Sequence, residues 1–314
     1  MGRLFGTDGA RGVAITELTC EMAMNIGRAA AIVLTKHKPA HKKAKILIGK
    51  DTRISSDVLE NALAAGIASV GADVELLGVV PTPAVAYLVK YYEADAGVMI
   101  SASHNSVEYN GIKLFSNTGF KLPDEVENEI ETLILDTPEK IQLKNGTEIG
   151  RIRTMYGAVS EYNEHLESTI DGNLSGLMAA IDCANGSASA TAEALFTKLG
   201  VDVIMINDKP DGCNINDNCG STHIENLQRV VVERGCDFGV AFDGDADRCL
   251  AVDEKGRLVD GDKLIAIISR YMKETGTLKN DTAVVTVMSN LGFHGFMKKN
   301  SINTVCTKVG DRYV

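Results

Sequence analysis

Short apolar runs rich in β-branched residues alternate with longer helical stretches along this sequence, and this alternation restricts the fold more than any other feature. The first clear unit consists of an expected strand at 45–49, a helix near 56–70 and a strand at 73–77. Parallel strands need a long crossover connection, which is usually a helix. The pattern therefore predicts an α/β fold whose sheets are mixed but mainly parallel.

The same α/β unit recurs later in the chain. A second copy has expected strands at 178–182 and 201–205, and a third copy runs from 283–287 to 303–307. The helices of the first two copies end alike, since Gly71 and Gly200 both stand where a helix C-cap is expected. The sequence is thus best explained as a series of repeated α/β modules.

The length of 314 residues suits two or three domains. Boundaries are expected in the polar stretch 145–153 and in the charged, glycine-containing turn 253–256. This predicts domains at 1–153, 154–255 and 256–314. The third copy has only begun when the sequence stops, so we expect the chain to be a fragment of a longer protein.

Charge and cysteine content bear on partners and compartment. With 42 acidic and 32 basic residues, the net charge of −10 argues against binding a nucleic-acid backbone. The seven cysteines are scattered and fit neither a disulfide framework nor a CxxC zinc site, which favours a reducing cytoplasm. The sequence has no leader-like h-region and no apolar run of about 18 residues, so we expect a soluble protein without a membrane partner.

The first stretch that suggests chemistry is 97–105, an apolar strand that runs into Ser101, Ser103, His104 and Asn105. In α/β sheets, ligands bind beyond the carboxyl ends of strands, where such a loop can present a hydroxyl group. The alternative is that these side chains only satisfy the backbone groups of a turn. His104 taken alone would be an ordinary surface histidine.

The second stretch places Asp243, Asp245 and Asp247 at alternate positions directly after an apolar strand, 238–242. Such carboxylates repel one another unless a cation offsets their charge. Oxygen-only ligands suit Mg²⁺ or Ca²⁺ better than zinc. An EF-hand loop is a poor alternative because Arg248 stands where its glycine is required, and a solvated acidic turn remains the other interpretation.

Basic residues in glycine-containing segments suggest an anion site within an acidic protein. Arg11, Lys113 and Arg248 are candidates for binding phosphate oxygens, and the segment 49–53 belongs to the same group. Each of these residues, taken singly, is more often part of a surface salt bridge. Cys213 and Cys219 lack further ligands at zinc spacing and are interpreted as bystanders.

Together these stretches resemble the α-D-phosphohexomutase superfamily, and the resemblance spans nearly the whole chain. The serine and metal loops are specific to the superfamily, whereas the first and last segments favour its glucosamine phosphate branch. Two positions depart from the usual pattern, since Ser106 and Ile224 stand where proline is common. The matching segments are Phe5-Gly-Thr-Asp-Gly-Ala-Arg-Gly12, Ile100-Ser-Ala-Ser-His-Asn105, Asp243-Gly-Asp-Ala-Asp-Arg248, Thr286-Val-Met-Ser-Asn-Leu-Gly292 and Thr307-Lys-Val-Gly-Asp-Arg-Tyr313.

The resemblance implies four domains around a central cleft, of which this chain would hold two and the beginning of a third. It implies that Ser103 is phosphorylated and that one Mg²⁺ is held by the three aspartates of the metal loop together with Ser103. The enzyme would be an isomerase-class intramolecular phosphotransferase. It would convert glucosamine 6-phosphate to glucosamine 1-phosphate through a bisphosphate, for cell-wall amino-sugar precursors, although we expect this chain alone to be inactive.

The resemblance also assigns supporting residues. His104 and Lys113 would serve proton transfer or phosphate orientation, Arg11 would act electrostatically in catalysis, and Arg248 and Gly310 would bind substrate. Two alternatives stay open, namely a sister mutase acting on glucose or mannose phosphates and a non-catalytic phosphosugar-binding module. The expected partner is a phosphosugar, and whether the protein forms a homo-oligomer stays open.

Overall fold

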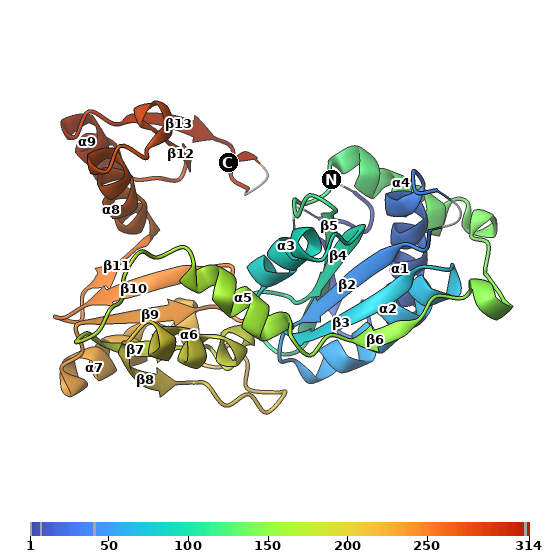
Figure 1. Ribbon diagram of the computed structural model, residues 1–314, viewed down its shortest axis with the longest axis horizontal. Helices are drawn as coiled ribbons and strands as arrows, with labels where there is room; N and C mark the ends of the chain where they lie inside the picture. Colours follow the sequence, from blue (N-terminus) through green and yellow to red (C-terminus); the bar gives the residue numbers. More distant parts are fainter. Residues whose placement is uncertain (1, 7, 40–41, 311–312) are drawn as a thin grey trace.

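The computed structural model describes residues 2–6, 8–39, 42–310 and 313–314. Among these residues it has three β-sheets, each with its own helices, and the expected α/β fold with mixed, mainly parallel sheets is confirmed. Figure 1 shows the three units in chain order, from the blue and green unit through the yellow and orange unit to the red unit.

The first sheet has the strand order β1-β5-β4-β2-β3-β6. Strands β4, β2, β3 and β6 are parallel, whereas β5 is antiparallel to both β4 and β1. The strands are β1 (Ala10–Val13), β2 (Lys45–Lys50), β3 (Asp73–Val79), β4 (Ala96–Ile100), β5 (Tyr109–Ser116) and β6 (Ile152–Thr154).

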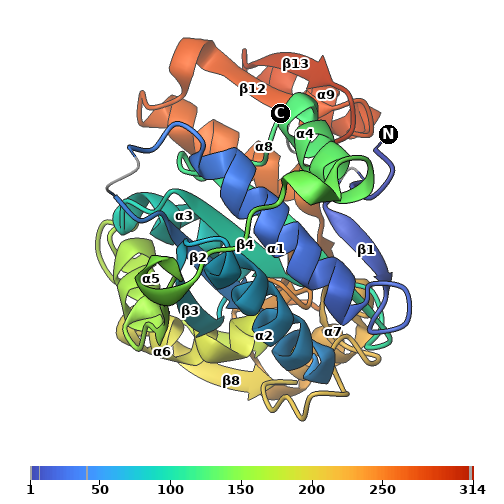
Figure 2. The ribbon, with the colours of Figure 1, turned by 90° about the vertical axis from the view of Figure 1, so that its right-hand side faces the viewer.

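Helices cover both faces of this sheet, because its strands carry apolar side chains on each side. In β2, Ile46 and Ile48 face one core and Leu47 faces the other. Figure 2 shows α1 and α2 lying across the sheet on the first of these faces. The helices on that face are α1 (Cys20–Thr35), α2 (Ile54–Ser69) and α4 (Asp124–Leu135), and those on the other are α3 (Thr82–Tyr91) and α5 (Ala158–Glu167).

The second sheet has the order β11-β10-β9-β7-β8, with β8, β7 and β9 parallel. Because β11 pairs with β10, this sheet continues to Val259, a few residues beyond the boundary expected at 255. The elements are β7 (Met178–Asp182), β8 (Asp202–Ile206), β9 (Phe238–Phe242), β10 (Cys249–Asp253) and β11 (Leu258–Val259), with α6 (Ala192–Lys198) and α7 (Glu225–Arg234) on opposite faces.

The third unit is small, with one pair of parallel strands packed against two helices. Its elements are α8 (Gly261–Glu274), β12 (Thr282–Thr286), α9 (Leu291–Lys299) and β13 (Asn303–Thr307). Short 3₁₀ helices connect elements in all three units: η1 (Pro138–Lys140), η2 (Gly146–Glu148), η3 (Ser187–Ala190), η4 (Gly220–Thr222) and η5 (Lys279–Asp281).

Polar backbone contacts join the first two units at the edge where their parallel strands end. Thr52 Oγ1 donates to the Asn185 carbonyl at 2.6 Å, and the Ile54 amide donates to the Gly212 carbonyl at 2.9 Å. The amide of Thr82 likewise donates to the Asp245 carbonyl at 2.9 Å. These bonds join the loops after β2 and β3 to the loops after β7, β8 and β9.

The structure also bears on the cysteines and on the length of the apolar helices. All seven cysteines are free thiols. Within the described residues, no helix combines the length and the apolar character that crossing a bilayer requires.

Candidate active site

Ser103 lies in the loop that follows β4, and its backbone is held while its side chain points across the interface. Its φ of +54° is a left-handed conformation that is uncommon for a residue other than glycine. The Ser103 amide donates to Ser101 Oγ, which in turn donates to Asp51 Oδ2. Ser103 is fully buried rather than exposed, contrary to what a loop position suggests.

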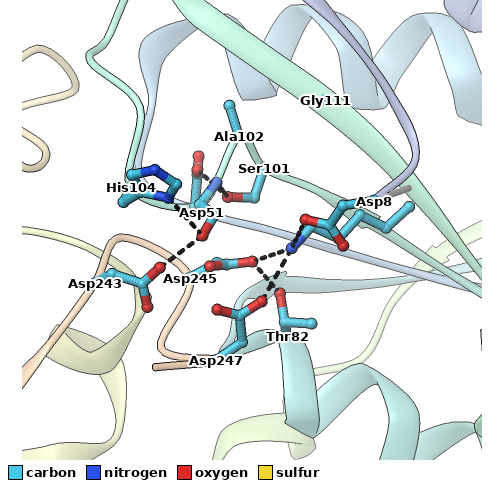
Figure 3. Close-up of polar contacts among 12 residues, drawn as sticks. Asp8, Asp51, Thr82, Ser101, Ala102, His104, Gly111, Asp243, Asp245 and Asp247 are labelled. Atoms are coloured by element: carbon cyan, nitrogen blue, oxygen red, sulfur yellow. Dashed lines mark hydrogen bonds and ion pairs between the residues drawn. The ribbon is translucent and has the colours of Figure 1, made fainter. Parts of the chain in front are cut away.

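The Ser103 hydroxyl meets the loop between β9 and β10. Ser103 Oγ donates to Asp243 Oδ2 at 2.6 Å, and His104 Nδ1 lies 3.5 Å from Ser103 Oγ. Figure 3 shows the serine loop on one side and the carboxylates of the β9–β10 loop facing it. Two segments about 140 residues apart in the chain thus form one site.

The three aspartates of the β9–β10 loop converge as the sequence predicts. One carboxylate oxygen from each of Asp243, Asp245 and Asp247 lies within 4.8 Å of the other two. Asp243 and Asp245 are buried, and Asp247 keeps 30% of its side chain exposed. Gly244 permits this arrangement, since a Cβ there would lie 2.6 Å from the Ser103 carbonyl oxygen.

Lys113, on β5, is the cation that partly offsets these charges. Its Nζ lies 2.7 Å from Asp245 Oδ2, 3.3 Å from Asp247 Oδ2 and 3.2 Å from Asp8 Oδ2. Thr82, at the start of α3, donates its hydroxyl to Asp245 Oδ2 at 2.5 Å. The other oxygen of that carboxylate, Asp245 Oδ1, is buried and has no hydrogen-bond partner among the described residues.

Burial and neighbouring charges give the three carboxyl groups different pKa values. Burial, together with the charges of Asp245 and Asp247, raises the pKa of Asp243 to about 7. Burial would also raise the pKa of Asp245, but the Lys113 ammonium outweighs it and holds that pKa below its ordinary value. Burial and the Asp245 charge raise the pKa of Asp247.

Burial and neighbouring charges also shift the pKa values of Lys113, Asp8 and His104. Burial opposes ionisation of Lys113, yet the surrounding aspartates raise its pKa, so it stays protonated at neutral pH. Burial opposes ionisation of Asp8, but Lys113, Lys121 and Arg11 lower its pKa. Burial, followed by the nearby charges of Arg248 and Arg11, lowers the pKa of His104, which is therefore a neutral imidazole at pH 7.

The arginines predicted to bind anions lie near the site but have protein partners. Arg11 pairs with Asp8, and its Nη1 lies 3.5 Å from the Ala102 carbonyl oxygen. The Arg248 side chain is 53% exposed, and its Nε lies 3.9 Å from Asp247 Oδ1. Arg248 is thus available to a ligand, whereas Arg11 is largely engaged.

Gly310 has a φ of +133° and packs beside Tyr313. No contact with the serine loop or the aspartate loop is recorded for it among the described residues. Asp311 and Arg312, which belong to the same predicted segment, lie outside the described residues.

The site also contains residues whose place in it the sequence does not indicate. Thr82 follows β3, whose carboxyl end lies at the same edge as that of β4, so sheet topology would have indicated it. Asp51 and Arg53 belong to a segment that the sequence suggests for an anion site, but both are buried and pair with each other at 2.8 Å. Asn216, from the stretch between Cys213 and Cys219, bonds to the serine loop, and no sequence signal marks it.

The donor set fits a hard divalent cation. Three carboxylates are gathered within ion-binding distance, one buried oxygen lacks a partner, and the adjoining hydroxyl supplies a further oxygen. Oxygen ligands of this kind suit Mg²⁺. The site can therefore place a hydroxyl nucleophile beside a cation and a fixed ammonium group.

Models of one protein family match most of this chain. Residues 2–140, 160–256 and 260–314 match the phosphoglucomutase/phosphomannomutase alpha/beta/alpha domains I, II and III, respectively. Phosphoglucosamine mutases of Acetivibrio thermocellus and Clostridium beijerinckii are each 58% identical to this chain over its whole length. The chain spans 70% and 69% of those two proteins.

Solved structures share the fold. A phosphoglucomutase/phosphomannomutase family protein from Burkholderia thailandensis superimposes with a TM-score of 0.82 at 23% identity, covering 98% of this chain and 66% of its own. The Aspergillus fumigatus N-acetylphosphoglucosamine mutase, in complex with GlcNAc-6P and magnesium, gives a TM-score of 0.64 at 19% identity, covering 99% of this chain and 63% of its own.

Proposed function

The chain belongs to the phosphoglucomutase/phosphomannomutase family, and from this premise we propose that it is a phosphoglucosamine mutase, an isomerase-class enzyme that interconverts glucosamine 6-phosphate and glucosamine 1-phosphate. The observation that carries the proposal is the 2.6 Å contact between Ser103 Oγ and Asp243 within a cluster of three carboxylates and one lysine. The names of relatives at 58% identity support the choice of an amino-sugar substrate.

In the proposed reaction, phosphorylated Ser103 is the phosphoryl donor. The bond between phosphorus and Ser103 Oγ breaks as a bond forms to the free hydroxyl oxygen of the sugar monophosphate. That hydroxyl gives its proton to a base, and Ser103 Oγ takes up a proton as it leaves. The resulting bisphosphate reorients, and its other phosphoryl group returns to Ser103. His104, neutral at pH 7 and 3.5 Å from Ser103 Oγ, is suited to accept the Ser103 proton when the serine attacks the bisphosphate and to return it when the serine leaves.

Fixed charges would favour transfer by stabilising the developing phosphoryl charge. Lys113 stays protonated and lies at the centre of the site, so it acts as a fixed positive charge. Arg248, whose side chain is half exposed, would bind a phosphate of the substrate. Gly310 keeps its proposed substrate-binding role on the resemblance alone.

We propose that Mg²⁺ is the cofactor and that Asp243, Asp245 and Asp247 hold it together with an oxygen of phosphorylated Ser103. The buried, unpartnered Asp245 Oδ1 supports this assignment, since a buried carboxylate oxygen normally has a partner. When bound, the ion neutralises charge on the transferring phosphoryl group. Asp245 would then share its two oxygens between the ion and Lys113.

The free thiols and the absence of a membrane-spanning helix among the described residues support a cytoplasmic location, which we also propose. The product would supply amino-sugar precursors of the cell wall.

A substrate panel tests this function. The full-length gene product, supplied with Mg²⁺ and a sugar bisphosphate, is assayed with glucosamine, glucose and mannose phosphates, with Ser103→Ala as the inactive control. We expect the highest kcat/KM for glucosamine 6-phosphate. A higher kcat/KM for glucose or mannose phosphate would show that the protein is a sister mutase. If none of the sugars accepts a phosphoryl group, the proposal is rejected.

A further inference from the structure

The serine loop is held through its carbonyl oxygens as well as through the Ser103 amide. Two of these carbonyls, those of Ser103 and Asn105, each accept hydrogen bonds from two different side chains. A carbonyl oxygen has two lone pairs, so both oxygens are fully used. The two donor side chains come from different units of the fold.

The first donor is Arg53, at the start of α2 in the first unit. Its Nη2 donates to the Ser103 carbonyl at 3.1 Å and to the Asn105 carbonyl at 2.8 Å, and its Nη1 donates to the Ser106 carbonyl. The guanidinium is fully buried and is fixed by Asp51, which accepts from its Nε at 2.8 Å. Arg53 therefore supports the loop from the side of the first sheet.

The second donor is Asn216, in the second unit. Its Nδ2 lies 2.9 Å from the Ser103 carbonyl oxygen and 3.0 Å from that of Asn105, the same two acceptors that Arg53 uses. Asn216 is buried and has a left-handed φ of +59°. Its position is further limited by Gly244, where a Cβ would come within 2.8 Å of Nδ2.

We propose that Asn216 is a positioning residue which, opposite Arg53, clamps the left-handed conformation of Ser103 and so aims its Oγ at Asp243. This inference deepens the proposed function and rests on it. Phosphoryl transfer depends on alignment of the attacking and leaving oxygens, and a small misplacement of either is costly. Because Asn216 belongs to the second unit, the clamp also fixes the serine to the domain that carries the aspartates.

The test replaces Asn216 with glycine, which tolerates a positive φ and so removes the amide without adding backbone strain. Asn218→Gly is the matched control, since Asn218 has a φ of +50°, is exposed, and donates its side-chain amide to its neighbour Asp217. Arg53 is left unchanged because its loss would strand the buried Asp51 carboxylate. Both variants are made in the full-length gene product, and kcat, KM, Tm and hydrogen exchange of residues 101–106 are measured.

We expect N216G to lower kcat by about 10- to 100-fold relative to N218G, with KM changed by less than about twofold, since substrate binding does not use the clamp. Amides of residues 101–106 should exchange at least about tenfold faster in N216G. A kcat equal to that of N218G would overturn the proposal even if Tm falls, because a merely structural role predicts that result.

The experiment separates this inference from the proposed function. Absence of turnover in the unsubstituted protein counts against the proposed function. Loop exchange still tests the clamp in that case, and equal exchange in N216G and N218G overturns it.

Discussion

At the scale of single residues, the site depends on which of its four carboxylates Lys113 contacts. Lys113 lies within 3.3 Å of Asp245, Asp247 and Asp8, whereas Asp243 receives a hydrogen bond from Ser103 and none from Lys113 among the described contacts. This difference explains why the pKa of Asp245 is lowered while that of Asp243 rises to about 7. Asp243 is thus the carboxylate whose ionisation is most sensitive to pH near neutrality.

This pKa predicts how Mg²⁺ binding depends on pH. A carboxyl group with a pKa of about 7 is mostly protonated at pH 6 and mostly ionised at pH 8, and only the ionised form binds metal. We expect the Mg²⁺ association constant of the unphosphorylated protein to rise about tenfold between these pH values, as measured by calorimetry. A flat profile, or one that Asp243→Asn leaves unchanged, would contradict the assignment.

Removing one aspartate tests the ligand set itself. Asp245→Asn removes a buried carboxylate charge and should weaken Mg²⁺ binding by at least about tenfold, with Asp217→Asn as an exposed control elsewhere in the chain. Direct titration with Mg²⁺ measures both. An affinity in Asp245→Asn equal to that of the control would exclude Asp245 as a ligand.

At this scale the sequence indicated the serine and the aspartates that the structure brings together, but not the side chains that hold them. Ser103 and the three aspartates stand out because their spacing after apolar strands is unusual for a plain turn. Asn216 could not be predicted, since its role depends on a contact 113 positions away in the chain. Arg53 resembled a surface cation in sequence, and only packing reveals that it is buried against Asp51.

At the scale of elements, the site is made by two loops that approach more closely than side chains would allow. Gly244 lies against the serine loop, and a Cβ there would lie 2.6 Å from a backbone oxygen that cannot move aside easily. The loop therefore requires glycine for close approach rather than for a positive φ.

This close approach predicts the effect of Gly244→Ala. Forcing a methyl group into the interface should cost about 1–3 kcal/mol of unfolding free energy and lower kcat, because Ser103 must shift. Gly295→Ala is the control, since nothing lies within 4 Å of a Cβ at that position in α9 and alanine favours a helix. Thermal unfolding and turnover are compared. A Gly244→Ala variant as stable and active as Gly295→Ala would show that the loops have room to separate.

The order and type of the elements were largely predictable, because periodicity and turn residues act locally. The strands β7 and β13 have the expected bounds. The helix expected near 56–70 is α2, Ile54–Ser69. Gly71 and Gly200 both have the left-handed φ expected after a helix, at +100° and +87°. The antiparallel pairing of β1 with β5 was not predictable from these signals, since it joins distant segments.

At the scale of the whole molecule, the three units differ in how well they are packed. The first two are joined through the site, whereas the core of the third has six buried apolar residues in the described part of the chain. Apolar side chains of α8, including Ile267, Ile268 and Tyr271, are more than half exposed. The domain boundaries at 153 and 255 stay a prediction, although β11 extends the second sheet to Val259.

This difference in packing predicts unequal protection from hydrogen exchange. Amides of β12 and β13 should exchange at least about tenfold faster than those of β7 and β9 in this 314-residue chain, because fewer buried contacts oppose local opening. Exchange measured by mass spectrometry on peptides from both sheets checks this. Equal protection in the two sheets would mean that the third unit is as cooperative as the second.

The central claim is that Ser103 carries the phosphoryl group that is passed to the sugar. The full-length gene product is incubated with a ³²P-labelled sugar bisphosphate and Mg²⁺, the labelled peptide is identified by mass spectrometry, and excess glucosamine 6-phosphate is then added. We predict one phosphoryl group per chain on Ser103, none in Ser103→Ala, and transfer of the label to the sugar on addition of substrate. Label on another residue, or label on Ser103 that substrate does not remove, would contradict the account.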